Sequence, residues 1–496
     1  MIHFSWDEIF TKIKTYFDCS WLGVRHIQYV MLFVVVNICY AVRSILSIAI
    51  FAMTAEDPPD KSIPTYPEWV PYKNIMLSSF FWGYICLQIV AGILIKRYGP
   101  KWFLGGAIFI GCLFCCLIPL LGARMGYGGV IFCRIVTGLT QGFLFPSIHC
   151  LLSSWTPLQD RAKFGTFVYA GGPLGNVISM PIAGFISNSH LGWPAVFYLF
   201  GALGIVWSVV WFIIGSDSPS KHKSISEEEV QYIEQNTEPR DKEEKVEPTP
   251  WKAILTSMPV WAILVSHCGQ NFGFWTLLTE IPSYMHQILN FDLKSNSTLS
   301  SLPYLTNWIL SLFMSPIADF IIIKKYANVG QSRKIFNTIG LWIPALALIS
   351  LTFVDSDNRV AAIILLTIAV GFNSAVYSGY NVNHLDISPV HAGTLMALTN
   401  SVSNIFSLIS PLVVDAIIAI TGYQENQKQL WTFVFCIAAG IYILCGCFYD
   451  LFASGEVQSW NTSGTSSVDP ESQKPEKQQE AEVFEDIQLG KVENGI

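Results

Sequence analysis

Long apolar runs separated by short polar loops make up the pattern of this chain from residue 27 to residue 452. A helix needs about 20 apolar residues to cross the hydrocarbon core of a bilayer, and run after run reaches that length. Because lipid offers the backbone no hydrogen-bonding partner, each spanning segment should be an α-helix. The pattern predicts an all-α membrane protein with twelve transmembrane helices, near residues 27–53, 74–95, 102–123, 130–152, 164–188, 194–215, 258–285, 299–323, 335–354, 360–383, 393–421 and 430–452.

Two polar stretches divide the chain into domains. Residues 216–252 hold ten acidic and six basic side chains and separate the sixth run from the seventh. The stretch after residue 452 is rich in Ser, Gln and Glu, a composition typical of disorder. We therefore expect a cytosolic N-terminal segment (1–26), a six-helix bundle (27–215), a cytosolic linker (216–257), a second six-helix bundle (258–452) and a disordered acidic cytosolic tail (453–496).

Positive charge in the loops predicts the orientation. The loops on the side of the N-terminus hold twelve Lys and Arg residues, and those on the other side hold six. Cytosolic loops carry the excess of Lys and Arg, so both termini should lie in the cytosol. The membrane is the plasma membrane or a lysosomal or vesicular membrane, and the oligomeric state is left open.

The net charge of the whole chain differs from that of its membrane-embedded body. The chain is 52% hydrophobic and 13% charged, with a net charge of −7. The linker and the tail contribute −4 and −6, which leaves −7 + 10 = +3 on the membrane-embedded body. A mildly basic body fits the passage of anions, although positive loops alone also explain it. Nothing in the chain indicates a nucleic-acid partner.

Two arginines lie inside apolar runs. Arg43 is in the run 27–53 and Arg134 is in the run 130–152. An arginine does not lose its proton, so each guanidinium needs a partner, a wet cavity or an anion within the bilayer. These two positions point to a pathway for small anionic solutes.

Several other classes of protein are excluded or weakened. The chain has no Gly-x-x-x-x-Gly-Lys-Ser/Thr loop, so it should not drive transport by hydrolysing ATP. Its twelve cysteines lie almost entirely in the apolar runs without a His or carboxylate cluster, so we expect no metal and no cofactor. No nucleophile and base are placed together, so the chain should not be an enzyme. A secondary transporter, an anion channel or a receptor remains.

Five stretches resemble one family: Phe80–Tyr84, Trp155–Arg161, Gly192–Tyr198, Gly379–Asp386 and Phe452–Glu456. They are similar to the organic anion and phosphate transporters (the anion:cation symporter family) of the major facilitator superfamily. This family includes sialin, the vesicular glutamate transporters and the type I sodium–phosphate cotransporters. The resemblance implies two six-helix bundles that alternate access to a central site and an anionic substrate such as phosphate, a carboxylate, sialic acid or urate.

The resemblance also implies roles for individual residues. Arg43, in the stretch Tyr40–Arg43, is similar to the family's first-helix arginine that holds the substrate carboxylate, and Tyr40 shares its helix face. Arg134 and Gln141 lie two turns apart on one face of the fourth helix. In proton-coupled relatives the first position of this pair is similar, with an arginine, and the second position holds a glutamate. Gln141 cannot exchange a proton, so the simplest proton relay is missing.

The driving force follows from this difference. We expect transport driven by membrane potential or sodium, with modulation by chloride possible, since one charge crossing 100 mV gains about 2.3 kcal/mol. The alternative is a proton-coupled carrier of sialic acid or glutamate type in which Asp415 or Glu280 substitutes for the missing acid. A channel-like anion conductance would use the same arginines.

The remaining candidates are polar groups in cavity-lining spans, charged loop residues and one glycosylation sequon. Tyr84, Ser378 and Asn400 are expected to contact the substrate, and Asn271 to take part in gating or coupling. Charged residues after the second and eighth helices should form and break contacts as the bundles move: Lys96, Arg97, Lys101, Asp319 and Arg333. Asn296, in an Asn-Ser-Thr sequon of an outside loop, is a predicted glycosylation site.

Overall fold

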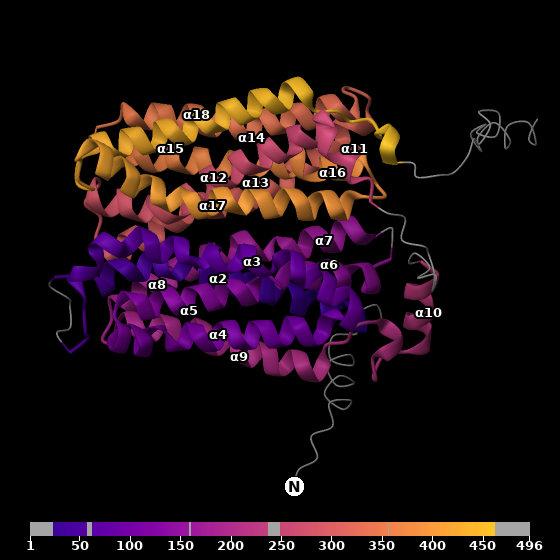
Figure 1. The fold of residues 1–496 in the computed structure, drawn as a ribbon, viewed down its shortest axis with the longest axis horizontal. Helices are drawn as coiled ribbons and strands as arrows, with labels where there is room; N and C mark the ends of the chain where they lie inside the picture. Colours follow the sequence, from indigo (N-terminus) through magenta and orange to yellow (C-terminus); the bar gives the residue numbers. More distant parts are fainter. Residues whose placement is uncertain (1–22, 57–61, 158–159, 237–248, 356, 462–496) are drawn as a thin grey trace, which may run out of the picture.

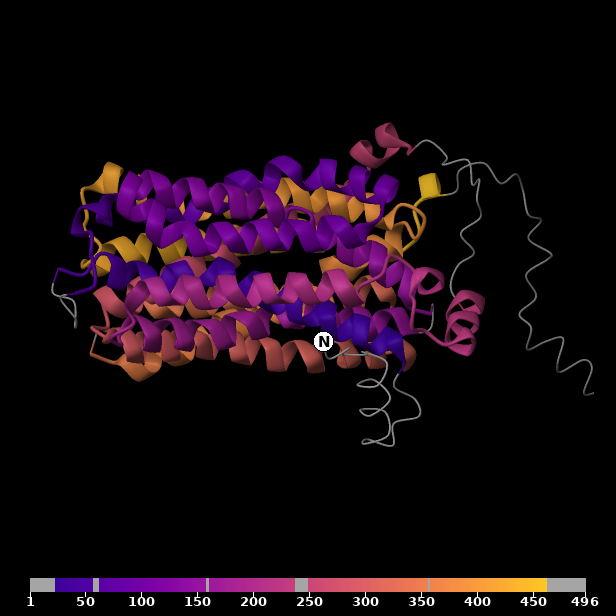
Figure 2. The same ribbon diagram turned by 90° about the horizontal axis from the view of Figure 1, so that it is seen from below.

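The computed structural model describes residues 23–56, 62–157, 160–236, 249–355 and 357–461, and this part of the chain is helical without strands. The helices run side by side along the long axis in two layers, with the N-terminal half in one and the C-terminal half in the other (Figure 1). The view turned by 90° shows the same lengthwise arrangement (Figure 2). The predicted all-α fold of two bundles is confirmed.

Each half contains six helical spans. In the N-terminal half they are α2 (Val24–Met53), α3 (Lys73–Tyr98), α4 (Pro100–Met125), α5 (Tyr127–Gln141) with α6 (Leu144–Trp155), α7 (Arg161–Tyr169) with α8 (Gly171–Ser187), and α9 (Gly192–Ile214). In the C-terminal half they are α12 (Met258–Gln287), α13 (Leu293–Ile323), α14 (Val329–Thr352), α15 (Arg359–Phe372) with α16 (Tyr380–Ile387), α17 (Ala392–Thr421) and α18 (Lys428–Phe452).

Nine helical segments in the described part of the chain are long and apolar enough to cross a membrane by length and composition alone. The other three spans of the two halves are α3, α7 with α8, and α12. All three lie at the interface between the halves, where α3 packs on α17, α8 on α13 and α12 on α2.

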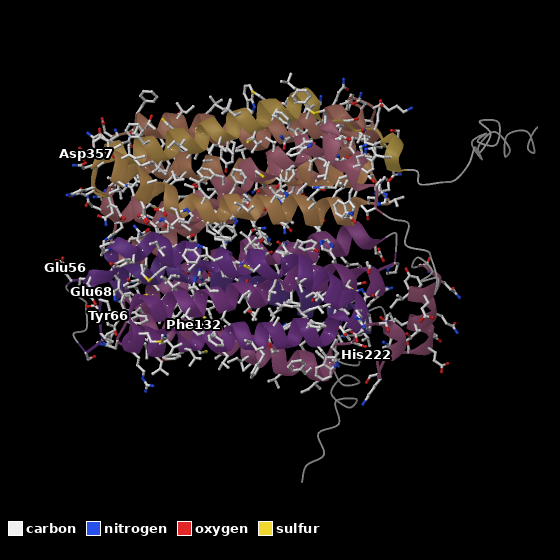
Figure 3. All side chains as sticks on the ribbon, viewed as in Figure 1. Glu56, Tyr66, Glu68, Phe132, His222 and Asp357 are labelled. Carbon is white, nitrogen blue, oxygen red and sulfur yellow. The ribbon has the colours of Figure 1, made fainter. Side chains whose placement is uncertain are left out.

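The two ends of the molecule differ. One end, here called the linker end, carries α10 (Glu227–Gln235) and His222, and the opposite far end carries Glu68 and Asp357 (Figure 3). The hydrogen bonds and ring contacts that join the two halves by named side chains gather toward the far end: Lys73 with Glu425, Asn74 with Asp415, Ser78 with Leu408 and Phe51 with His286. The structure is therefore closed between the halves at the far end.

The linker contains folded elements where the structure describes it. The Glu229 carboxylate of α10 accepts hydrogen bonds from the backbone nitrogens of Val24 and Arg25, each at 3.0 Å. These groups belong to the first turn of α2, whose free N–H groups and dipole favour a carboxylate. The linker thus fixes the start of the helix that carries Arg43.

The predicted tail begins later than residue 453. Gln458 donates its backbone N–H to the Ile387 carbonyl at 2.9 Å, and Ser388 donates its hydroxyl to the Asn461 side chain at 2.8 Å. Residues 453–461 are therefore folded against the end of α16, although the composition of this stretch predicted disorder. The rest of the tail (462–496), most of the N-terminal segment (1–22) and linker residues 237–248 lie outside the described residues.

Candidate functional site: two buried arginines in a central pocket

Arg43 is buried in the middle of the N-terminal half. Its Nε donates a hydrogen bond to Oε1 of Gln141 at 2.7 Å, which joins α2 to α5. The rings of Tyr40, Phe80 and Tyr84 surround the guanidinium, with centroids 4.9, 5.0 and 4.9 Å from Cζ. Aromatic faces stabilise a cation without neutralising it. The positive charge of Arg43 is therefore held in place and kept.

Arg134 reaches across from α5 to the backbone of α2. Its Nη1 donates to the Val42 carbonyl at 3.2 Å and its Nη2 to the Arg43 carbonyl at 3.4 Å. The Phe80 ring centroid lies 5.2 Å from its Cζ, so one ring contacts both guanidinium groups. Arg134 thus fixes the helix segment from which Arg43 projects.

Two glycines allow this arrangement. A Cβ on Gly138 of α5 would overlap the Phe80 carbonyl, and a Cβ on Gly83 of α3 would overlap the Ile135 carbonyl. The backbones of α3 and α5 therefore touch at this level, as small residues permit in membrane helices. The contact brings the Phe80 and Tyr84 rings onto the face that carries Arg134 and Gln141.

A pocket opens beside the arginines at the interface between the halves. It is lined by Arg43, Ser44, Ser47, Leu77, Phe80, Phe81, Arg134, Trp275, Leu278 and Thr279. α2, α3 and α5 supply the basic wall, and α12 supplies the opposite wall. Aromatic and small polar side chains with a few charged groups are typical of a small-molecule site.

The arginines keep unused hydrogen-bonding capacity. Nη2 of Arg43 and Nε of Arg134 are buried without a hydrogen-bond partner, and no carboxylate in the described part of the chain forms an ion pair with either residue. Asp415 and Glu280 do not line the pocket, and Asp415 accepts a hydrogen bond from Asn74 at 2.7 Å. Two buried positive charges with free donors can bind an anion.

The other predicted polar residues lie in different surroundings. Tyr84 contacts Arg43 and also interacts with Asn400 of α17, so this pair connects the arginine site to the C-terminal half. Asn271 donates to the Ser403 hydroxyl at 2.8 Å, a bond between α12 and α17. Ser378 is buried, and its carbonyl accepts a hydrogen bond from Arg333 at 3.2 Å. Of the predicted substrate contacts, Arg43 and Arg134 line the pocket. Tyr40, Tyr84, Ser378 and Asn400 do not line it, and their contact with the substrate stays a prediction.

The charged loop residues lie at the linker end. Nε of Arg333 pairs with Oδ2 of Asp386 at 2.7 Å, which is the kind of contact expected for these residues. The backbone N–H of Lys101 donates to Asp217 at 2.8 Å, whereas Arg97 and Asp319 are exposed. The side chain of Lys96 lies outside the described residues.

The predicted glycosylation of Asn296 disagrees with the structure. Asn296 lies inside α13 rather than in a loop, is fully buried, and donates its side-chain nitrogen to the Pro282 carbonyl at 2.8 Å. A glycan attached to this nitrogen would have to displace the packing of α12 on α13. The sequon predicted exposure because Asn296 follows the polar stretch 290–295, but α13 already begins at Leu293.

Sequence reasoning missed three residues that shape the site. Phe80 lies between the two arginines, and its i, i+4 spacing to Tyr84 was the signal that places both rings on one helix face. Lys73 was counted only as a loop charge, yet it pairs with Glu425 at 2.7 Å and closes the far end. No pattern in the sequence predicts that partner, because 352 residues separate the two.

Comparison with known proteins identifies the family. Residues 32–411 match the model of the Major Facilitator Superfamily. The chain belongs to the major facilitator superfamily, in the branch of organic anion and phosphate transporters, and is a transporter rather than an enzyme.

Individual relatives support this placement. The chain is 40% identical over 461 residues to a candidate inorganic phosphate cotransporter of Drosophila ananassae, covering 89% of this chain and 95% of the relative. It is 38% identical to human sialin (78% of this chain, 76% of the relative) and 35% identical to human vesicular glutamate transporter 2 (93% and 78%).

Solved structures share the fold. A bacterial homologue of the human lysosomal transporter Spinster, in an inward-facing and unoccupied conformation, superposes with a TM-score of 0.62 at 12% identity over 86% of this chain and 96% of that one. A D-xylose–proton symporter superposes with a TM-score of 0.61 at 15% identity over 86% and 98%. These similarities concern the fold alone.

Proposed function

We propose that this protein is a secondary active transporter that moves phosphate or small organic anions through the pocket at Arg43 and Arg134 by alternating access. The observation that carries the proposal is the pair of buried guanidinium groups with free donors and, in the described part of the chain, no carboxylate partner. Relatives named for inorganic phosphate, and relatives named sialin or vesicular glutamate transporter, support an anionic substrate.

The arginines have different tasks in this proposal. Arg43 has a free Nη2 and lines the pocket, so it binds the anion's oxygens directly. Arg134 uses two nitrogens to hold the backbone of α2, and it adds positive charge that attracts the anion into a low-dielectric site. Tyr84 and Asn400 connect the loaded site to the C-terminal half, so that binding can draw the halves together.

Membrane potential or a sodium gradient supplies the driving force. Gln141, the group bonded to Arg43, has no proton to exchange, and a net charge that crosses the field responds to the potential directly. In this proposal the linker end and both termini face the cytosol, and the far end faces outward or into an organelle lumen. The protein resides in the plasma membrane or in a lysosomal or vesicular membrane.

The closed far end favours a carrier over a channel. Lys73, Asn74 and Ser78 of α3 each bond to the C-terminal half, so the pocket has no passage to the far side in this conformation. Anions then cross only when these contacts break and others form, as alternating access requires. A channel would give currents that greatly exceed the flux of labelled anion.

Uptake into proteoliposomes tests the proposal. Labelled phosphate, glutamate and sialic acid are offered while a potassium-diffusion potential, a sodium gradient and a pH gradient are imposed separately. Accumulation driven by potential or sodium, and lost in Arg43→Ala, supports the proposal. Accumulation driven by the pH gradient alone overturns the assigned driving force, and no accumulation of any anion overturns the function.

A further inference from the structure

A buried carboxyl group lies beside the far-end contacts without any use in the anion site. Glu280 of α12 is 0% exposed, and neither of its carboxyl oxygens has a hydrogen-bond partner among the described residues. Its neighbour Thr279 lines the pocket but Glu280 itself does not. Burying an ionised carboxylate without a partner has a large free-energy cost, so such a group binds a proton and becomes neutral.

The positive neighbour of Glu280, Lys73, is already paired with another carboxylate. Lys73 of α3 gives both of its closest contacts to Glu425, at 2.7 and 2.8 Å, and a third to the Ser283 hydroxyl at 3.3 Å. Asp415 of α17 adds another negative charge, partly satisfied by Asn74. The electrostatic neighbours of Glu280 are these three groups, Lys73, Glu425 and Asp415.

The charge balance of this cluster decides the protonation state. Lys73, Glu425 and Asp415 sum to −1, and an ionised Glu280, whose own side chain has no exposed surface, would bring the net charge of the cluster to −2. Arg43 of α2 faces the pocket, which Glu280 does not line, and aromatic rings and Gln141 surround its guanidinium. A proton on Glu280 keeps the net charge of the cluster at −1 without further contacts.

We propose that Glu280 is a proton-binding site whose proton must be bound for the far end to close and is released to the far-side solution when the far end opens. This inference rests on the proposed alternating access, since only an opening far end wets Glu280. The closed form binds one proton more than the open form, so closure is favoured as the pH on the far side falls. The proton enters and leaves from the same side, so it regulates the cycle rather than driving it.

Cross-linking between the halves measures closure without any substrate. Phe51 and His286 face each other across the far end with ring centroids 5.0 Å apart, so the pair Phe51→Cys/His286→Cys reports contact there. The yield is compared with that of the same pair carrying Glu280→Gln, which normalises for the pH dependence of thiol chemistry. The closed-to-open ratio of the wild-type background should rise by up to about tenfold per pH unit as the far-side pH falls, and the ratio with Glu280→Gln should stay high and flat.

Two variants and a change of sodium concentration show whether Glu280, Asp415 or sodium controls closure. Asp415→Asn, a carboxylate already bonded to Asn74, should leave the pH dependence in place. If Glu280→Gln keeps the pH dependence, or if sodium rather than pH controls closure, the proposal is wrong. Failure of the uptake experiment with an intact pH-dependent closure would overturn the proposed substrate but not this site.

Chemical labelling tests the same proposal on the wild-type protein, so the result does not depend on how well a variant folds. Dicyclohexylcarbodiimide reacts with protonated carboxyl groups in apolar surroundings, and peptide mass spectrometry identifies the modified residue. Labelling should occur at Glu280 and not at Glu425, which is ion-paired to Lys73, and should decline as the far-side pH rises. Unlabelled Glu280 at acidic pH, in protein whose other buried sites react, would contradict the proposal.

Discussion

Arg43 and Gln141 meet at 2.7 Å, with the guanidinium Nε donating to the amide oxygen. The amide accepts this bond without cancelling the charge of the arginine, as a carboxylate would. The site therefore keeps the full positive charge of Arg43 available to an incoming anion. Together with the surrounding Tyr40, Phe80 and Tyr84 rings, this contact holds a guanidinium that has no carboxylate partner among the residues that the structure describes.

Replacing the amide with an acid should block the site in a pH-dependent way. Gln141→Glu places a carboxylate within ion-pair distance of Arg43, where it competes with the substrate. We expect anion uptake at pH 7.5 to fall by about tenfold or more, equivalent to about 1.4 kcal/mol of binding, and to recover partly at pH 5 as the new acid is protonated. Gln141→Leu, which adds no charge, is the control; equal loss in both variants at both pH values would contradict the account.

The close contact of α3 and α5 should not tolerate a methyl group. Gly138→Ala forces a Cβ into the Phe80 carbonyl, which should lower the free energy of unfolding by about 1–3 kcal/mol and displace the Phe80 ring. Gly128→Ala in the same helix is the matched control, since its Cβ would meet open space and should change stability by about 1 kcal/mol or less. The midpoint of thermal unfolding of the purified protein compares the two; similar shifts would contradict the assigned packing.

The ion pair at the far end should hold the closed conformation. Lys73→Ala removes the partner of Glu425 in a pair whose side chains are 6% and 18% exposed, so the far end should open more often. We expect a Ser47→Cys reporter in the pocket to react about tenfold faster with an impermeant thiol reagent applied from the far side.

A second ion pair at the same end is the matched control for Lys73→Ala. Lys428 and Asp355 lie 3.5 Å apart with 36% and 91% of their side chains exposed, a geometry worth about 0–1 kcal/mol. Lys428→Ala should leave the reaction of the reporter nearly unchanged. Equal acceleration in both variants would show that the Lys73 pair has no special role in closure.

The sequon at Asn296 should remain unmodified in the folded protein. Its side-chain nitrogen is buried and bonded to the Pro282 carbonyl, so no glycan fits there. Glycosidase treatment should leave the electrophoretic mobility of the protein unchanged, and Asn296→Gln should not alter it. A mobility shift that disappears in Asn296→Gln would show that this part of α13 is arranged differently.

Helix number and the two central arginines could be predicted from sequence, and contacts between distant helices could not. Arg43 and Arg134 stand out because a permanent charge in an apolar run requires an explanation at any position. The sequence places a residue in a span or a loop but does not show which way its side chain faces. For this reason it did not show that Ser378 lies outside the pocket or that Asn296 is buried in α13. The ion pair of Lys73 with Glu425 depends on the packing of two halves, which local pattern does not encode.

Equilibrium binding to the purified protein tests the central claim most directly. The ligand is the labelled anion that the wild type accumulates most, and it is titrated against the wild type, Arg43→Ala and Arg124→Ala. Arg124 is exposed at the end of α4, so Arg124→Ala is the charge-matched control. The account predicts at least about hundredfold weaker binding, or roughly 2.7 kcal/mol, in Arg43→Ala alone. Unchanged affinity in Arg43→Ala, with the protein folded, would show that the buried arginine is structural and that the anion binds elsewhere.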